Sequence, residues 1–171
     1  MPFSGMGNRV RPGQNRRAKE ISLVTQKALL PVVDLKEYPN AVVDVFIELP
    51  QTDAGSRCAG ICAASIALAD AGIPMKDLVS AVSVGTVDGT IVVDLDYLEE
   101  AYEEGEEGVA DIPIAYIPST QELSLLQMDG VITRDKLVEA LEIGKKACEE
   151  IIEIQKKALK EKYKISGEDN E

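Results

Sequence analysis

The chain has 171 residues, enough for one domain with a hydrophobic core of its own. Its apolar fraction of 45% is ordinary for a globular protein, and the sequence has neither an apolar run of membrane-spanning length nor an opening signal peptide. The net charge of −12 argues against a protein that binds nucleic acid over its whole surface.

The charge is distributed unevenly along the chain. Residues 1–19 contain four Arg, one Lys and no acid, whereas residues 77–133 contain thirteen acids and no base. The chain therefore combines a short basic arm with a long acidic segment. A solvated acidic surface together with a disordered basic tail, with no role in binding, explains this distribution of charge equally well.

The three cysteines are Cys58, Cys62 and Cys148. Their odd number and the lack of a secretory signal predict reduced thiols in a cytoplasmic protein. Cys58 and Cys62 have a spacing that metal ligands can use, but the chain has no histidine and no second cysteine pair. We therefore expect them to pack in the core.

The first half of the chain predicts two helices and one strand. Residues 1–14 are rich in Gly and Pro and are expected to form a loop. Asn15 can cap a helix over about residues 16–30, which Pro31 ends. The apolar segment AVVDVFIEL, residues 41–49, predicts a strand.

A second, apolar helix follows over about residues 57–71, with Ser56 as its N-cap and Gly72 at its end. In the second half, four short strands are predicted, at residues 79–86, 90–95, 111–117 and 123–128. Asp88-Gly89 is the turn signal between the first two. Thr133 can cap a last helix that reaches about Tyr163.

This order of elements predicts an α+β domain over residues 15–165, between the basic loop 1–14 and a frayed tail at 166–171. No strand is predicted ahead of the first helix. We therefore expect the sheet to lack strands at one edge, which would invite pairing with another chain.

The turn before the second helix is the best candidate for a binding site. In QTDAGSRCAGICAAS, residues 51–65, the helix start follows Gly55, Ser56 and Arg57. Main-chain N–H groups at a helix start bind anions, the Ser hydroxyl adds a donor, and the Arg fork suits phosphate. The alternative is a capped helix whose Arg extends into solvent.

Two further arginines, Arg16 and Arg17, stand at the start of the first helix, where the helix dipole opposes cations. A bound phosphate would offset this cost, and Arg9 and Arg11 in the preceding loop suit further phosphates. An exposed pair that tolerates the small cost is an equally good explanation.

Within the acidic segment, Asp111 differs from its neighbours because it precedes the apolar run Ile112–Ile117. A partly buried carboxylate that faces a phosphate site can act as a general acid or hold a divalent metal. The alternative is an Asp at a strand end with no role in chemistry.

Several motifs together resemble the ribonuclease PH family. They are PFS, RPGQNRRAKEIS, VVDVFIELPQTDAGSR, ASIALADAGIPMKDLVSAVSVGTVDGTIVVDLD and LLQMDGVIT, and they cover nearly the whole chain in order. The resemblance implies a fold like the second domain of ribosomal protein S5. It also implies a phosphorolytic 3′–5′ exoribonuclease, in which inorganic phosphate attacks the last linkage of RNA and releases a nucleoside diphosphate.

As in archaeal exosomes, the resemblance implies a six-membered ring of alternating catalytic and non-catalytic subunits, with RNA-binding cap subunits. In such a protein Gly55, Ser56 and Arg57 hold the attacking phosphate, and Arg16 and Arg17 hold the RNA near its 3′ end. Asp111 matches an active-site Asp that is usually linked to Mg²⁺ or another divalent metal.

The chain departs from the family pattern in three ways. Where the family has an Asp as general acid, this sequence has Glu100, so that the acid is Glu100, or Asp96, or absent. Asn40 stands where an RNA-contacting Arg is usual. Family chains also begin well before PFS, so we expect this domain to lack the first strands of the fold.

The leading hypothesis is therefore a phosphorolytic exoribonuclease subunit. The alternative is a structural ring subunit with impaired catalysis, which Asn40 and Glu100 would permit. An unrelated anion-binding domain is a third and weaker explanation.

Overall fold

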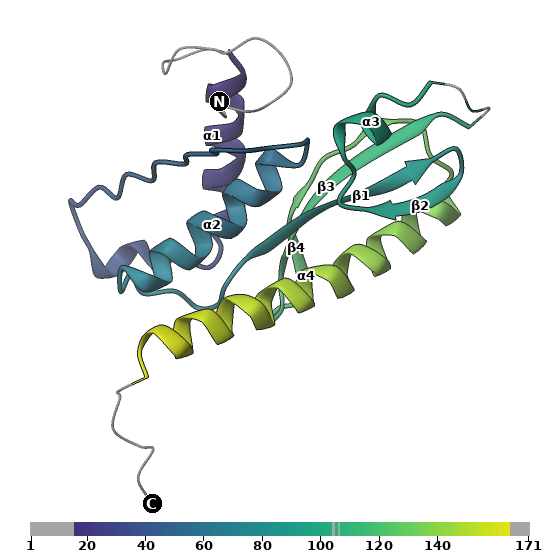
Figure 1. Ribbon diagram of the computed structural model, residues 1–171. Helices are drawn as coiled ribbons and strands as arrows, with labels where there is room; N and C mark the ends of the chain where they lie inside the picture. Colours follow the sequence, from purple (N-terminus) through teal and green to yellow (C-terminus); the bar gives the residue numbers. More distant parts are fainter. Residues whose placement is uncertain (1–15, 104, 106, 165–171) are drawn as a thin grey trace, which may run out of the picture.

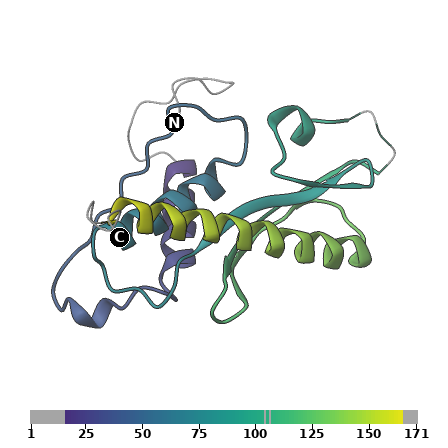
Figure 2. The same cartoon turned by 60° about the horizontal axis from the view of Figure 1, so that its bottom comes forward.

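The computed structural model describes residues 16–103, 105 and 107–164. Helices α1 (Arg16–Leu29) and α2 (Ser56–Asp70) lie together at one end, and an antiparallel sheet lies at the other (Figure 1). The long helix α4 (Arg134–Lys162) runs along the sheet and reaches α2 (Figures 1 and 2). Among the described residues, no helix combines the length and apolar character that a membrane span requires.

The sheet has the strand order β2-β1-β3-β4, and every pairing in it is antiparallel. Its strands are β1 (Ser80–Val87), β2 (Thr90–Val93), β3 (Val109–Ile117), β4 (Glu122–Leu126) and the short β5 (Asp129–Gly130), which pairs with β3. The four predicted strands of the second half are confirmed, and β5 is an addition.

One face of the sheet packs on α4. Val84, Ile112 and Ile114 form a buried cluster with residues of this helix. Gly144 permits the close approach, because a Cβ there would stand only 2.7 Å from Ile114 Cδ1 and 2.8 Å from Val84 Cγ1. Since side chains alternate along a strand, the residues between these point to the opposite face.

The opposite face of the sheet packs on α2 near the start of β1. Ile61, Ala64 and Leu68 of α2 form a second buried cluster with Val79 and Ala81. Gln155 of α4 crosses to this region, where its Nε2 donates to the carbonyls of Cys62 at 3.0 Å and Val79 at 3.4 Å. Both faces of the sheet are therefore covered at this end.

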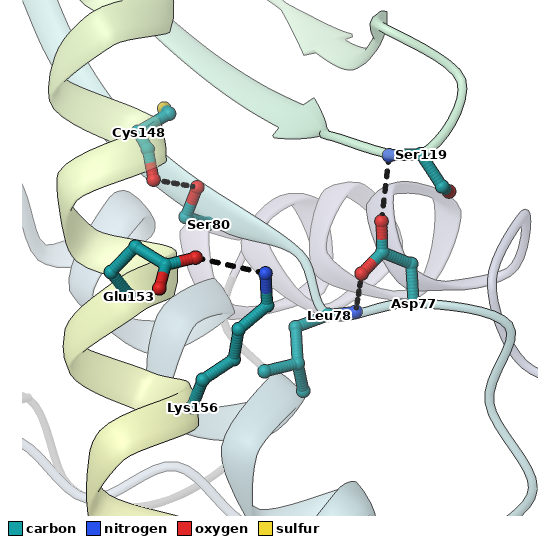
Figure 3. A network of polar contacts seen from close by, with 7 residues as sticks. All are labelled: Asp77, Leu78, Ser80, Ser119, Cys148, Glu153 and Lys156. Atoms are coloured by element: carbon teal, nitrogen blue, oxygen red, sulfur yellow. Dashed lines mark hydrogen bonds and ion pairs between the residues drawn. The ribbon is translucent and has the colours of Figure 1, made fainter.

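Polar contacts fix the start of β1 (Figure 3). The Asp77 carboxylate accepts hydrogen bonds from the main-chain N–H groups of Leu78 and Ser119, each at 2.8 Å. Ser80 Oγ donates to the carbonyl of Cys148 on α4 at 2.9 Å. These bonds join β1 to the β3–β4 turn and to α4.

The three long helices follow the sequence predictions closely, with one correction at a cap. Thr133 caps α4, as predicted, by accepting from the N–H of Lys136. Ser56 was expected to cap α2, but it is the first helical residue, and the N-cap is Gly55 in the left-handed conformation. Asn15, the predicted cap of α1, lies outside the described residues.

The predicted strand at residues 41–49 is wrong: this segment belongs to no sheet. It runs apart from the sheet as an irregular trace between the short helix η1 (Leu35–Glu37) and α2 (Figure 1). A strand needs a neighbour to satisfy its main chain, and the described residues supply none here.

The cysteine prediction agrees with the packing. Cys58 and Cys148 are buried in the two core clusters, and Cys62 Sγ contacts the main chain of Ala81. The boundaries 15–165 of the domain remain a prediction, because both ends of that range, the loop 1–14 and the tail 166–171 lie outside the described residues.

Candidate active site

A cavity of about 400 Å³ lies between the starts of the two helices and the face of the sheet opposite α4. One wall carries Arg17 of α1 with the turn Ala54–Arg57 before and at the start of α2. The other wall carries Ser83 of β1, Asp111 of β3 and, from another segment, Glu100. Residues 127–129 close one side of the cavity. The cavity therefore brings cationic and acidic side chains from distant parts of the sequence together.

The turn on the first wall leaves the helix start open. Ala54 and Gly55 both have left-handed backbone angles, with φ of 59° and 54°. No side chain caps α2, and the Ser56 hydroxyl has no hydrogen-bond partner among the described residues. The first N–H groups of α2 and the Ser56 hydroxyl are thus donors that an anion in the cavity can engage.

Arg57 stands at a helix start, where the helix dipole is unfavourable for a cation, and it has a carboxylate partner there. Its Nη2 donates to Glu20 Oε1 of α1 at 2.9 Å, and only 21% of its side chain is exposed. Within the described part of the chain, its buried Nε finds no acceptor. Arg57 thus lies against the cavity instead of extending into solvent, and its buried Nε donor is left for a ligand. Sequence analysis missed Glu20, which lies 37 residues away.

The other predicted arginines divide into three groups. Arg16 and Arg17 are both exposed at the start of α1, but only Arg17 lines the cavity. Arg9 and Arg11 lie outside the described residues. The structure therefore brings one arginine of the predicted RNA-binding set to the cavity that the turn before α2 lines.

Asp111 lies half-buried in β3, where it pairs in register with Gly85 of β1. Its Oδ1 accepts a hydrogen bond from Ser83 Oγ, and Ser83 is itself buried. Ser83 thus fixes the direction of the carboxylate. Sequence analysis did not identify Ser83, because its place beside Asp111 depends on the register of β1 with β3.

Glu100 reaches the cavity from a helix that sequence analysis missed, α3 (Tyr97–Glu100). A capping box of Asp96 and Glu99 fixes its first turn. Asp53 Oδ1 also accepts from the N–H of Tyr97 at 3.2 Å, so that α3 is joined to the turn before α2. Asp96 serves as the cap and does not line the cavity, which leaves Glu100 as the better candidate for the acid.

The environment of Glu100 raises the pKa of its carboxyl above its ordinary value. Glu100 is exposed, but partial burial of its carboxyl raises this pKa, and the Asp111 carboxylate raises it further. Arg17 and Arg57 act in the opposite direction. A carboxyl with a raised pKa keeps its proton to higher pH than an ordinary Glu, which favours a role as proton donor.

A metal is compatible with this donor set. The described residues contain no group of three or more side chains suited to hold a metal ion. Mg²⁺, however, commonly binds through one or two carboxylates and takes its other ligands from phosphates and water. Asp111 fits that requirement.

Comparison with known proteins agrees with this geometry. Residues 1–74 match the 3′ exoribonuclease family, domain 1, and residues 77–147 match domain 2 of the same family. The chain belongs to this family, the ribonuclease PH family, and the resemblance seen in the sequence is confirmed.

Similar proteins include the exosome complex component Rrp41 of Thermococcus gammatolerans, 49% identical over 168 residues, and that of Nitrosopumilus maritimus, 46% identical over 162 residues. These alignments cover 98% and 95% of this chain but 65% and 64% of the relatives, so that the chain spans just under two thirds of their length. A crystal structure of rice Rrp46 superposes with a TM-score of 0.76 at 22% identity, covering 92% of this chain and 70% of that one. The predicted α+β fold of the ribonuclease PH type is confirmed.

Proposed function

We propose that this chain forms the phosphate- and RNA-binding part of a phosphorolytic 3′–5′ exoribonuclease. The proposal is carried by one observation: the uncapped start of α2 and Arg57 face Glu100 and Asp111 across one cavity. An anion site opposite a carboxyl pair suits an attack by phosphate on a phosphodiester.

Inorganic phosphate binds to the N–H groups at the start of α2, to the Ser56 hydroxyl and to the unpaired Nε of Arg57. Arg17 holds the RNA backbone beside it. An oxygen of the phosphate attacks the last phosphorus of the RNA. The bond from this phosphorus to the 3′ oxygen of the preceding nucleotide breaks, and the terminal nucleotide leaves as a nucleoside diphosphate.

The leaving 3′ oxygen needs a proton, because an alkoxide is a poor leaving group at neutral pH. Glu100, whose pKa burial and Asp111 raise, donates this proton. Asp111, oriented by Ser83, would hold Mg²⁺ or another divalent metal. When bound, the metal neutralises negative charge that develops on the reacting oxygens.

The proposal extends to the assembly. The relatives are named exosome complex components, and the fold is that of rice Rrp46. These likenesses support a ring in which this chain alternates with a non-catalytic ribonuclease PH-like subunit in a hexamer, with RNA-binding cap subunits and a cytoplasmic location.

The test is the release of nucleoside diphosphates from a single-stranded RNA, with and without inorganic phosphate, and with and without a non-catalytic ring partner. We expect release that requires phosphate. Release of nucleoside monophosphates without phosphate would overturn the phosphorolytic mechanism. If the chain assembles into the ring but no product appears, the structural subunit is the correct alternative, as Glu100 in place of Asp would permit.

A further inference from the structure

Gln127 lines the cavity, but the chemistry proposed above gives it no role. Among the described residues, the buried side-chain atoms without a hydrogen-bond partner are Thr25 Oγ1, Arg57 Nε, Ser124 Oγ, Gln127 Oε1 and Gln155 Oε1. Of these residues, Arg57 and Gln127 line the cavity. Because a buried polar atom without a partner is unfavourable, both atoms are candidates to meet polar groups of a ligand.

The backbone places Gln127 beside the reacting groups. Its N–H donates to the carbonyl of Pro113 in β3 at 3.0 Å. Pro113 and Asp111 are two residues apart in this strand, so they point to one face of the sheet, and both line the cavity. Asp111 also pairs in register with Asp129, two residues after Gln127. Gln127 therefore lies next to the wall that carries Asp111.

The two unpaired atoms require opposite partners. Arg57 Nε is a donor and suits an oxygen of phosphate, whereas Gln127 Oε1 is an acceptor and requires a donor. The oxygens of an RNA phosphodiester carry no proton, and the donors on the bases differ from one nucleotide to the next. A ribose hydroxyl supplies a donor at the same place in every nucleotide, and the 2′-hydroxyl is the one that DNA lacks.

We propose that Gln127 binds a ribose 2′-hydroxyl next to the scissile linkage and thereby selects RNA over DNA. This inference rests on the proposed function, because it requires an RNA 3′ end in the cavity. The terminal torsion of a Gln side chain is soft, so the carboxamide can turn toward the cavity without a change in the backbone. The 2′-hydroxyl then donates to Oε1. A nucleotide without this hydroxyl leaves the oxygen unpaired and binds less tightly.

The experiment uses the full chain and short single-stranded RNAs of one sequence. One RNA is unmodified, and the others carry a single 2′-deoxy or 2′-fluoro substitution at the last or the penultimate nucleotide. The 2′-fluoro group cannot donate but keeps the sugar pucker of RNA, so it separates loss of the donor from a change in backbone shape. A 3′-deoxy RNA tests the 3′-hydroxyl, the other donor at the RNA end. Binding is measured by fluorescence anisotropy without inorganic phosphate, so that no phosphorolysis occurs.

Gln127→Met removes the acceptor and keeps a long, unbranched side chain. Ser124→Ala is the matched control, because it also removes a buried, unpaired oxygen, but from a residue of β4 that does not line the cavity. We expect the unaltered chain and Ser124→Ala to bind unmodified RNA about tenfold more tightly than RNA modified at one of the two 2′ positions. In Gln127→Met this ratio should fall to about one, because the affinity for unmodified RNA falls to that for the modified RNA.

Three results would overturn the inference. The first is equal affinity of the unaltered chain for the unmodified and all the 2′-modified RNAs. The second is the same ratio in Gln127→Met as in the unaltered chain, because a residue that only supports the packing weakens the binding of all these RNAs alike. The third is a dependence on Gln127 that appears with the 3′-deoxy RNA alone, because the 3′-hydroxyl would then be the donor.

The release of nucleoside diphosphates from unmodified RNA, measured in parallel with phosphate present, tests the proposed function separately. Release with a ratio that does not depend on Gln127 contradicts this inference and leaves the proposed function intact. A ratio that depends on Gln127, without any release, contradicts the enzymatic activity and leaves the 2′-hydroxyl contact intact. Absence of any RNA binding by the chain would overturn both.

Discussion

Gly55 offers a direct test of the anion site, through the change Gly55→Ala. Its φ is +54°, and a Cβ there would stand 3.3 Å from Asp94 Oδ1, so the new methyl group meets both backbone strain and a close neighbour. Gly72, after the other end of α2, is a matched control, because its φ is +75° and a Cβ there meets nothing within 4 Å.

Both changes place Ala in the left-handed region, at a cost of about 1–2 kcal/mol. For a chain of this length, such a cost lowers Tm by roughly 2–8 °C. Only Gly55→Ala adds a methyl group beside the N–H groups that we assign to phosphate. The loss of one hydrogen bond to a charged ligand costs about 1.5–3 kcal/mol, so phosphate affinity should fall at least about tenfold.

The assay is the rise in Tm that inorganic phosphate produces, because a ligand stabilises the fold according to its concentration and affinity. This measurement does not depend on catalysis. We expect the rise to be retained in Gly72→Ala and largely lost in Gly55→Ala. An equal phosphate response in the two variants would show that the turn before α2 is not the anion site.

Three further predictions concern the acid and the packing. Asp111→Asn should reduce nucleoside diphosphate release at least about 100-fold, whereas Glu100→Asp should leave it intact or improve it; unchanged release in Asp111→Asn would remove this residue from the mechanism. Asp53 is one of the charges that raise the pKa of Glu100. Asp53→Asn should therefore lower that pKa and move the fall of activity with rising pH to lower pH, and an unmoved pH profile would contradict Glu100 as the proton donor. Gly144→Ala should lower the free energy of unfolding in urea by about 1–3 kcal/mol, because its Cβ would overlap Ile114 and Val84, and no loss would contradict this packing.

Local signals in the sequence were sufficient for most of the fold. Helical periodicity, Thr133 as a cap and the Asp88-Gly89 turn located α4 and the β1–β2 hairpin to within a few residues. The short helix α3 was missed although its capping box, Asp96 with Glu99, stands in the sequence. A single turn between two acidic stretches has too little apolar periodicity to be detected.

The strand predicted at residues 41–49 failed for a different reason. Its composition favours a strand, but a strand is stabilised by a neighbour that local composition does not reveal. The Ser56 prediction failed because Gly55 adopts the left-handed angle and moves the helix start by one residue.

The charged residues that line the site were predictable from the sequence, but the residues that orient them were not. Arg57, Glu100 and Asp111, which were singled out by local context and by family resemblance, do line one cavity. Glu20, Asp53 and Ser83, which orient them, were not found. Each of these contacts joins segments that are far apart in the chain, so the relation exists only in the folded structure.

Helix α4 places a constraint on the width of the cavity, although it lies on the far side of the sheet. With 29 residues it is about 43 Å long. Its first half is packed against β1 and β3, whereas Gln155 and Lys162 fasten its second half to α2. The helix thus holds together the two parts of the molecule that carry Arg57 and Asp111. A small tilt of α2 relative to α4 would change the distance between the two facing walls of the cavity. A substitution along α4 can therefore change the spacing between Arg57 and Asp111 while every residue of the cavity stays the same.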